Sequence, residues 1–310
     1  MPSKSWAIIY CPKEGSPRTH KRWNKIRHYL DEQGVIYDFV QSEGPGSIER
    51  LASMMTRAGY TSIIVIGGDA ALNHALCGIM KSESPNGTRP ALGVIPNGFG
   101  NDFAKFWGYS TDNFKEAIDS LILRRLRKVD VGVAEVTLKD CEEPHDTLYF
   151  LNCLNLGVAS AITNLKRKTS SVFGFKTLSY FISALLLLFQ RMNFNFKFQL
   201  SGEKIDKNAM AICIGSAHGY GQTPSAVPYN GLLDITLVSK PQISQIFQGL
   251  GLLFTGRFLS HRGISVWRTS KVNFTSTGHA LLSIDGRVIH EPITQIKVGI
   301  LPSEINFIIP

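Results

Sequence analysis

A short buried strand that ends in two glycines is the feature that most limits how this chain can fold. Residues 61–66 include the β-branched run Ile63–Ile66, which predicts a central strand covered on both faces of a sheet. Further strands are predicted at residues 6–11, 35–40 and 92–95. Apolar residues recur at helical spacing over residues 18–33 and 47–58. Strands and helices that alternate in this order predict a parallel sheet covered by helices.

The pattern changes beyond about residue 128, where many short strands follow one another. They are predicted at residues 129–136, 148–155, 194–200, 209–215, 232–238, 272–276, 280–284 and 293–298. Helical spacing in this part is limited to residues 173–190 and 242–254. We therefore predict an α/β domain over residues 1–128 and a β-sandwich-like domain, or a flattened barrel, over residues 129–298. Residues 299–310 are predicted to return to the first domain as a strand.

Composition excludes several broad classes of protein. The 310 residues are 44% hydrophobic and 18% charged, which excludes a disordered or collagen-like chain. The longest apolar run, Ile182–Phe189 with only Ser183 interrupting, is far shorter than the roughly 18–20 residues of a membrane-spanning helix. Residues 1–15 lack the basic start and apolar core of a signal peptide, so we expect the protein in the cytoplasm. Five widely spaced cysteines without a CxxC pair predict neither a disulfide framework nor a zinc site.

The chain carries a net charge of +9, from 33 Lys and Arg against 24 Asp and Glu. Such a surplus favours anionic partners, namely nucleotides, nucleic acid or acidic lipid surfaces, and it is equally typical of an ordinary solvated basic surface. Basic residues cluster at residues 124–128 and 166–168, where they either dock anionic lipid or lie on solvated faces. Residues 178–189 are apolar nearly all round, which is typical of a core helix and also of a lipid-facing helix.

The glycines that end the central strand are followed by an acid and by the start of a helix. Gly67 and Gly68 allow a ligand to approach the backbone closely, and the free amides of the following helix attract an anion. Asp69 either caps that helix or positions a magnesium-phosphate group. Residues 92–104 repeat the order of strand, glycine-rich turn and helix start. Ligands of open parallel sheets bind beyond the carboxyl ends of the strands, so we expect both turns to face one crevice.

These segments resemble the motifs of the diacylglycerol kinase catalytic-domain family, which includes bacterial lipid kinases and sphingosine and ceramide kinases and is related to NAD kinases. The family pattern is GGDGTxNE, then IPxGTxND, and then DGE. Similar segments stand here at residues 67–74, 95–102 and 285–287, and further similarity lies at residues 155–157, 173–174, 220–221 and 231–234. The resemblance covers nearly the whole chain in the same order. It implies a nucleotide-binding first domain, a lipid-binding second domain and a site in the cleft between them.

The resemblance also implies ATP-dependent phosphoryl transfer to a lipid hydroxyl, with Mg²⁺ as the metal. The residues that match nucleotide contacts are Ser42, Gly67, Gly68, Asp69, Ala70, Ala71, Asn73, Gly98, Phe99 and Asn101. The residues at catalytic positions are Asp69, Asp102 and Arg287. A structural magnesium of bacterial members matches Val227, Asn230 and Leu232, of which the first and last would supply backbone carbonyls.

Several residues depart from the family pattern. In the nucleotide loops these are Ala70, Ala71, His74 and Phe99. Arg287 stands where the resemblance places a catalytic glutamate, and a guanidinium with a pKa above about 12 cannot accept a proton at neutral pH. Glu291 lies four residues further on and is either a substitute base or a solvated turn residue. Asn230 replaces the usual Asp, which removes a negative charge from the predicted magnesium site.

We therefore expect an ATP-dependent lipid kinase whose activity is impaired by Arg287. The main alternative is a catalytically inactive relative that binds nucleotide or lipid, and a weaker one is a small-molecule kinase closer to NAD kinases. The expected partners are ATP and a lipid substrate, with peripheral contact to an anionic membrane surface and no nucleic acid. The lipid and the oligomeric state stay open, with a homodimer as one option.

Overall fold

The computed structural model describes residues 6–12, 17–85, 87–98, 101–138, 146–161, 193–239 and 257–310, and also residues 143 and 252. The chain forms two compact units. The first contains residues 1–130 together with 302–310, and the second contains residues 131–301. Two strands, β5 (Arg125–Leu138) and β16 (Ile293–Ile309), run from one unit into the other.

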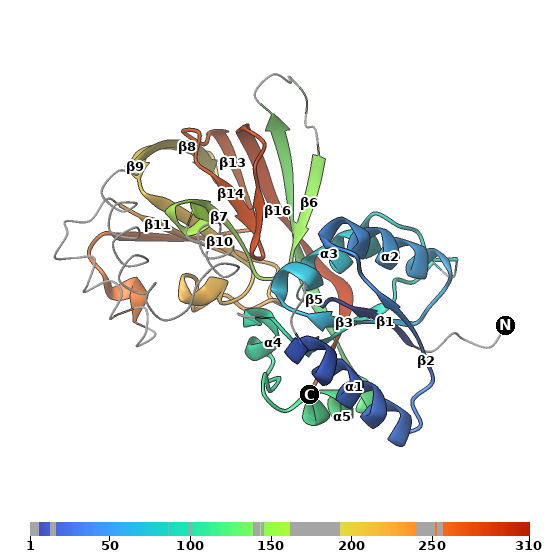
Figure 1. The fold of residues 1–310 in the computed structure, drawn as a ribbon. Helices are drawn as coiled ribbons and strands as arrows, with labels where there is room; N and C mark the ends of the chain where they lie inside the picture. Colours follow the sequence, from blue (N-terminus) through green and yellow to red (C-terminus); the bar gives the residue numbers. More distant parts are fainter. Residues whose placement is uncertain are drawn as a thin grey trace. The chain divides into compact units, whose positions relative to one another are not determined.

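The first unit is built on a parallel sheet with the strand order β2-β1-β3-β4. These strands are β1 (Trp6–Tyr10), β2 (Tyr37–Gln41), β3 (Ser62–Gly67) and β4 (Ala91–Pro96). The helices are α1 (Pro17–Glu32), α2 (Pro45–Arg57), α3 (Asp69–Met80), α4 (Asp102–Phe106) and α5 (Phe114–Leu123). Helices α2 and α3 cover one face of the sheet, and α1 and α5 cover the other (Figure 1). Every residue of β1, β3 and β4 is buried because helices lie on both faces.

The last part of β16 adds a strand to this sheet. Phe307 pairs in parallel with Leu92 of β4. The hydroxyl of Tyr109 donates a hydrogen bond of 2.7 Å to the carbonyl of Ile308. These contacts connect the end of the chain to the first unit.

The second unit consists of antiparallel sheets. One sheet has the order β12-β11-β10-β7-β14-β15. In the other, β16 is followed by β13, β8 and β9, while β5 pairs with β16 and with β6. The remaining bounds are β6 (Asp146–Phe150), β7 (Cys153–Gly157), β8 (Phe194–Leu200), β9 (Glu203–Ala209), β10 (Ala211–Gly215), β11 (Leu233–Val238), β12 (Ile264–Thr269), β13 (Lys271–Ser276), β14 (Leu282–Ile284) and β15 (Arg287–Ile289), with 3₁₀ turns at Gly219–Gly221 and Phe258–Ser260. Apolar side chains from both sheets form one core, with Phe150, Phe196 and Ile212 fully buried.

The predicted fold class is confirmed in both parts, a parallel sheet with helices followed by antiparallel sheets. The strand predicted over residues 148–155 is two strands, β6 and β7. They separate at Leu151 and Asn152, whose backbone N–H groups bind the Asp285 side chain instead of a neighbouring strand. The sequence patterns do not indicate β9, β12 or β15. The predicted helix 173–190, most of the predicted helix 242–254 and the basic run 166–168 lie outside the described residues.

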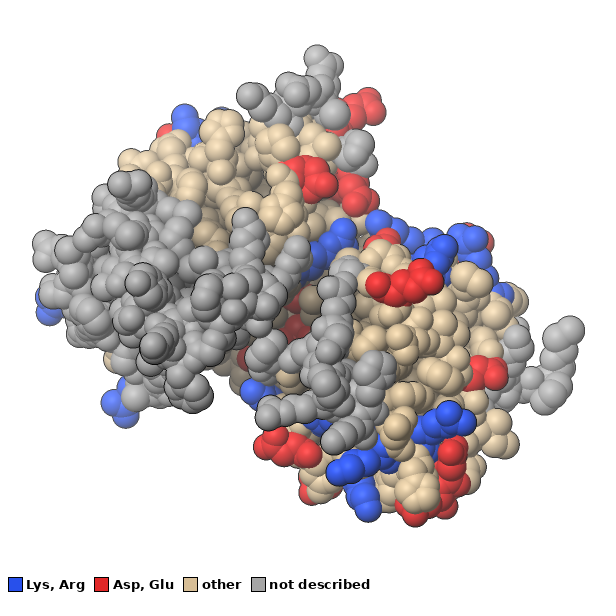
Figure 2. Space-filling view, in the orientation of Figure 1, with Lys and Arg blue, Asp and Glu red and all other residues tan. Residues whose placement is uncertain are grey.

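Charged side chains of both signs are interspersed on the face of the molecule that Figure 2 shows. Within the ranges given above, no helix is both long enough and apolar enough to cross a membrane.

Candidate active site

Neighbouring strands of the first unit end at one edge of the sheet. The backbone N–H of Cys11, after β1, donates to the carbonyl of Ile66 in β3 at 3.0 Å, and that of Ser42, after β2, donates to the last residue of β1 at 2.8 Å. The N–H of Asn97, after β4, donates to the carbonyl of Gly67 at 2.9 Å. The two glycine-rich turns therefore lie next to each other at the carboxyl ends of β3 and β4.

The backbones of the two turns touch at Gly68 and Gly98. A β-carbon added to Gly98 would lie 2.4 Å from the α-carbon of Gly68, and one added to Gly68 would lie 2.9 Å from the α-carbon of Gly98. These separations are too short for real β-carbons, so the close approach requires glycine on both sides. The contact joins two segments that are thirty residues apart in the sequence.

The carboxylate of Asp69 holds the second turn. Its Oδ2 accepts a hydrogen bond of 3.0 Å from the backbone N–H of Asp102, and its Oδ1 accepts one of 3.1 Å from that of Phe103. These N–H groups belong to the start of α4, where a carboxylate is favourable. The N-cap of α3 is Gly68, so the interpretation that Asp69 caps the helix it begins is wrong. Asp69 instead connects the two turns.

Asn101 closes the second turn on itself. Its Oδ1 accepts from the N–H of Gly98 at 2.9 Å, and its Nδ2 donates to the carbonyl of Gly98 at 2.9 Å. The residue is buried and adopts the left-handed conformation, with φ 49°, which Asn tolerates better than most residues. Phe99 lies outside the described residues.

Helix α3 carries the next three residues that match nucleotide contacts. Ala70 lies in the first turn of α3, so this position needs no positive φ and its methyl group does not distort the backbone. A β-carbon added to Gly67 would lie 2.7 Å from that of Ala71, so Ala71 packs against the first turn. Asn73 is buried, and its Oδ1 lies 3.9 Å from the thiol of Cys77, which donates to it. Asn73 is thus oriented by contacts inside the helix.

Ser42, which matches a nucleotide contact, lies at the same edge beside Cys11, which the sequence patterns do not single out. Ser42 is buried beside Cys11, whose β-carbon would lie 3.5 Å from a β-carbon added to Gly67. Burial raises the pKa of Cys11 to about 11, and a hydrogen bond with Ser42 partly opposes this shift. Cys11 is therefore a neutral thiol at neutral pH, not a nucleophilic thiolate.

Arg22 of α1 also supports the second turn. Its Nη2 donates to the carbonyl of Pro96 at 3.1 Å and to that of Thr111 at 3.0 Å. Pro96 is the last residue of β4, directly before the turn. A basic residue on an amphipathic helix gives no distinct sequence signal, so only the structure indicates this role.

In the second unit, Asp285 and Gly286 form the hairpin turn between β14 and β15. Both have positive φ, 45° and 80°, as in two-residue turns of type I′. The buried Asp285 carboxylate accepts hydrogen bonds from the backbone N–H groups of Leu151, Asn152 and Cys153 at 2.8, 3.0 and 2.8 Å. This turn is thereby fixed to the segment between β6 and β7.

Arg287 directly follows this turn as the first residue of β15. It pairs with Ile284 and is half-buried. The rigid turn fixes the backbone from which the guanidinium extends. Glu291 follows β15, and its side chain is exposed.

In the predicted structural magnesium site, two of the matching oxygens accept hydrogen bonds from backbone N–H groups of the same turn. The side-chain Oδ1 of Asn230 accepts from the N–H of Leu232 at 2.9 Å, and the carbonyl of Val227 accepts from the N–H of Tyr229 at 2.8 Å. The three matching positions supply an amide and backbone carbonyls but no carboxylate. Mg²⁺ in proteins is usually held by carboxylates, so these donors do not fit it.

An acid that follows this turn, Asp234, is paired with an arginine. The guanidinium of Arg268 binds both carboxylate oxygens of Asp234, through Nε at 2.6 Å and Nη2 at 2.9 Å. The same Nη2 donates to the carbonyl of Ser225 at 3.2 Å. A cation of the protein itself thus connects the two ends of the turn. In the described part of the chain, no cluster of three or more His, Cys, Asp or Glu could hold a metal ion.

A parallel sheet with two touching glycine-rich turns, followed by antiparallel sheets, places the chain in the class of NAD kinase-like folds. A solved structure of yeast NADH kinase complexed with NADH has this fold, with a TM-score of 0.57 and 11% identity over 99% of this chain and 83% of that one. Two family models match: "Diacylglycerol kinase catalytic domain" over residues 5–134, and "YegS C-terminal NAD kinase beta sandwich-like domain" over residues 154–309. The chain belongs to the diacylglycerol kinase catalytic-domain family, which is a family of ATP-dependent lipid kinases.

The chain is also similar to proteins that are named as diacylglycerol kinases. Diacylglycerol kinase of Staphylococcus carnosus is 25% identical over 287 residues, which are 90% of this chain and 87% of the relative. Diacylglycerol kinase of Staphylococcus aureus strain RF122 is 25% identical over 284 residues, 90% of this chain and 84% of the relative. The solved structure of "a putative diacylglycerol kinase from Bacillus anthracis str. Sterne" has a TM-score of 0.76 and 19% identity over 100% of this chain and 98% of that one.

Proposed function

We propose that this chain is an ATP-dependent lipid kinase that phosphorylates the hydroxyl of a diacylglycerol-like lipid. The observation that carries the proposal is the contact of Gly68 with Gly98, which brings two turns with backbone N–H groups together without intervening side chains. The Staphylococcus relatives, named as diacylglycerol kinases, support a lipid acceptor.

In this proposal the first turn and the start of α3 bind the phosphates of ATP. Helix N-termini and glycine-rich backbones attract phosphate oxygens through their N–H groups. Gly67, Gly68 and Gly98 supply backbone, and Asp69 and Asp102 supply carboxylates close to the phosphates. The remaining nucleotide contacts are proposed at Ser42, Ala70, Ala71, Asn73, Phe99 and Asn101. Mg²⁺ enters as part of the MgATP substrate, and Asp69 is the residue proposed to link it to the phosphates.

The acceptor hydroxyl must lose its proton during transfer, and Arg287 cannot take it. A positioned base typically contributes about 10²–10⁴-fold to such a step. We therefore expect slow turnover with nucleotide affinity retained, because a guanidinium favours bound phosphate. The departure at Ala71 points in the same direction, since the hydroxyl of the pattern's Thr is lost there.

A second candidate is a relative that binds nucleotide or lipid without turnover. The guanidinium at position 287 favours it, because the acid of the same turn, Asp285, is buried and already accepts three backbone hydrogen bonds. Both candidates act at a membrane surface from the cytoplasm in our proposal, with acidic lipid attracting the net charge of +9.

The deciding experiment incubates the purified chain with radiolabelled ATP and a panel of diacylglycerols, ceramides and long-chain bases. Slow labelling of a diacylglycerol supports the impaired kinase. An ordinary kinase rate of roughly 1–100 per second contradicts the impairment, and the base must then be sought elsewhere, with Glu291 first. Binding of MgATP with no labelled lipid supports the second candidate. No MgATP binding contradicts the kinase and leaves the second candidate only as a lipid-binding protein.

A further inference from the structure

A cavity of about 190 Å³ opens at the other edge of the first unit's sheet. Its lining includes Thr61, directly before β3, and Pro90, directly before β4. Because the strands are parallel, this edge lies opposite the edge with the two glycine-rich turns. The proposed nucleotide site does not use this cavity.

The polar groups of the cavity are hydroxyls, an amide and guanidinium groups. The hydroxyls belong to Thr61, Ser84 and Thr88, and the amide belongs to Asn306 of β16, while the hydroxyl of the lining Tyr60 donates to Asp38. Among the described residues, no Asp or Glu lines the cavity. Hydroxyls and guanidinium groups without carboxylates form a set that binds oxyanions.

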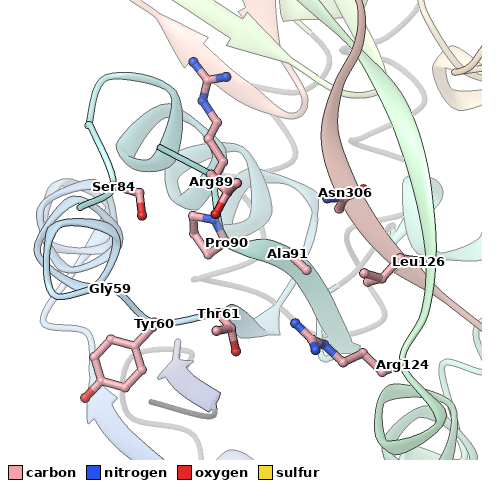
Figure 3. Close-up of a pocket in the computed structure, with 11 residues that line it drawn as sticks. Gly59, Tyr60, Thr61, Ser84, Arg89, Pro90, Ala91, Arg124, Leu126 and Asn306 are labelled. Atoms are coloured by element: carbon pink, nitrogen blue, oxygen red, sulfur yellow. The ribbon is translucent and has the colours of Figure 1, made fainter. Parts of the chain in front are cut away.

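Arg124 supplies the charge inside this cavity. Its side chain extends into it toward Thr61 and Ala91, whereas the side chain of Arg89 turns away (Figure 3). Arg89 forms an ion pair with Glu304, which neutralises its charge. Among the described residues, no carboxylate forms such a pair with Arg124, which leaves its planar donors for a ligand.

The surroundings of Arg124 strengthen the local positive potential. Arg124 is the first of four basic residues within 124–128, and all four are exposed. No acid interrupts this run. A pocket beside several basic side chains concentrates anions more strongly than a surface on which basic and acidic side chains alternate.

We propose that the cavity around Arg124 binds a phosphate group, as a second anion site of this chain that is separate from the nucleotide turns. The volume admits a phosphate with a small organic part and excludes a nucleotide. The phosphate comes either from a soluble phosphate ester or from a phospholipid headgroup. A purely structural account has Arg124 stabilise the C-terminus of α5 by its charge, and this account predicts no response to phosphate.

The test measures thermal unfolding of the whole chain against inorganic phosphate and glycerol 3-phosphate, with NaCl at the same ionic strength as reference. Vesicles of phosphatidylcholine with and without phosphatidic acid form the lipid arm, read by co-sedimentation. Arg124→Gln removes the charge inside the cavity, and Arg125→Gln is the matched control on the neighbouring exposed residue. Arg124→Gln is expected to weaken phosphate binding about tenfold or more, as loss of a charge-assisted contact does, and Arg125→Gln by less than about twofold.

If Arg124→Gln weakens binding of the soluble phosphates only, the ligand is a soluble phosphate ester. If it weakens binding of the phosphatidic acid vesicles only, the ligand is a phospholipid headgroup. The proposal fails if neither probe binds wild type, or if both variants respond alike. MgATP stabilisation must persist in Arg124→Gln. If it is lost together with the phosphate response, phosphate binds at the nucleotide turns and the second site is excluded.

Discussion

The side chain at position 287 sets a fixed positive charge on a rigid hairpin, directly after the turn formed by Asp285 and Gly286. Exchanging it for a carboxylate leaves the turn intact and supplies a group that can accept a proton. We expect Arg287→Glu to raise lipid phosphorylation by about 10²-fold or more and to weaken nucleotide binding. Both quantities follow from initial rates at several ATP concentrations. Arg262→Glu, on an exposed residue of the same unit, is the control for net charge and should change neither. A lower rate in Arg287→Glu would exclude the impaired-kinase account.

Glycine at position 98 is required because the backbone of Gly68 lies against it. A β-carbon there would meet the α-carbon of Gly68 at 2.4 Å, so the two turns must move apart. We expect Gly98→Ala to lower the free energy of unfolding by about 1–3 kcal/mol and to abolish stabilisation by MgATP. Gly46→Ala is the matched control, because nothing lies within 4 Å of its added β-carbon and Ala favours helix α2. Denaturant unfolding with and without MgATP measures both effects. Unchanged MgATP stabilisation in Gly98→Ala would show that the contact does not shape the nucleotide site.

Among the elements of the fold, the short hairpin β14–β15 is held in place mainly by the side chain of Asp285. Its carboxylate accepts three backbone hydrogen bonds, two from the segment between β6 and β7 and one from the first residue of β7. Asp285→Asn replaces one acceptor oxygen by a donor, so at least one buried N–H loses its partner. We expect a loss of about 2–3 kcal/mol in the free energy of unfolding. Asp206→Asn, on an exposed side chain of β9, should cost less than about 0.5 kcal/mol. Equal losses in the two variants would contradict the role of Asp285.

The turn before β11 is expected to be independent of metal. Arg268 already connects Asp234 with the carbonyl of Ser225, and Asn230 supplies no carboxylate. Without nucleotide, a chelator should therefore change the unfolding midpoint of wild type by less than about 1 °C. Arg268→Gln should cost about 1 kcal/mol, in keeping with a partly exposed ion pair. An octahedral ion in this turn, with oxygens near 2.1 Å, would contradict the prediction.

Elements encoded by neighbouring residues could be predicted from the sequence, and those that depend on distant partners could not. The buried strand before Gly67 and the turn after it are local patterns, and they sufficed for the fold class. The break between β6 and β7 depends on Asp285, more than 130 residues further on. The role of Asp69 depends likewise on N–H groups at positions 102 and 103. That the turn residues bind nucleotide stays a prediction, because it concerns a ligand and not the chain alone.

For the whole molecule, the strands shared by both units govern how it unfolds. β5 and β16 each contribute residues to both units, so one unit cannot unfold without disrupting strands of the other. We therefore expect one cooperative transition, although the glycine-rich turns belong only to the first unit.

MgATP should then raise the midpoint temperature of this single unfolding transition. A ligand present at 100 times its Kd stabilises the native state by about 2.7 kcal/mol. For a chain of this size that corresponds to a rise of roughly 4 °C. Calorimetry at millimolar MgATP measures the shift, and Gly98→Ala provides a protein in which the turns are disturbed. Two separate transitions, of which MgATP moves only one, would show that the shared strands do not couple the units. If wild type is fully folded at the start and MgATP does not change the midpoint temperature of a single transition, the result would contradict the nucleotide site and with it the proposed kinase function.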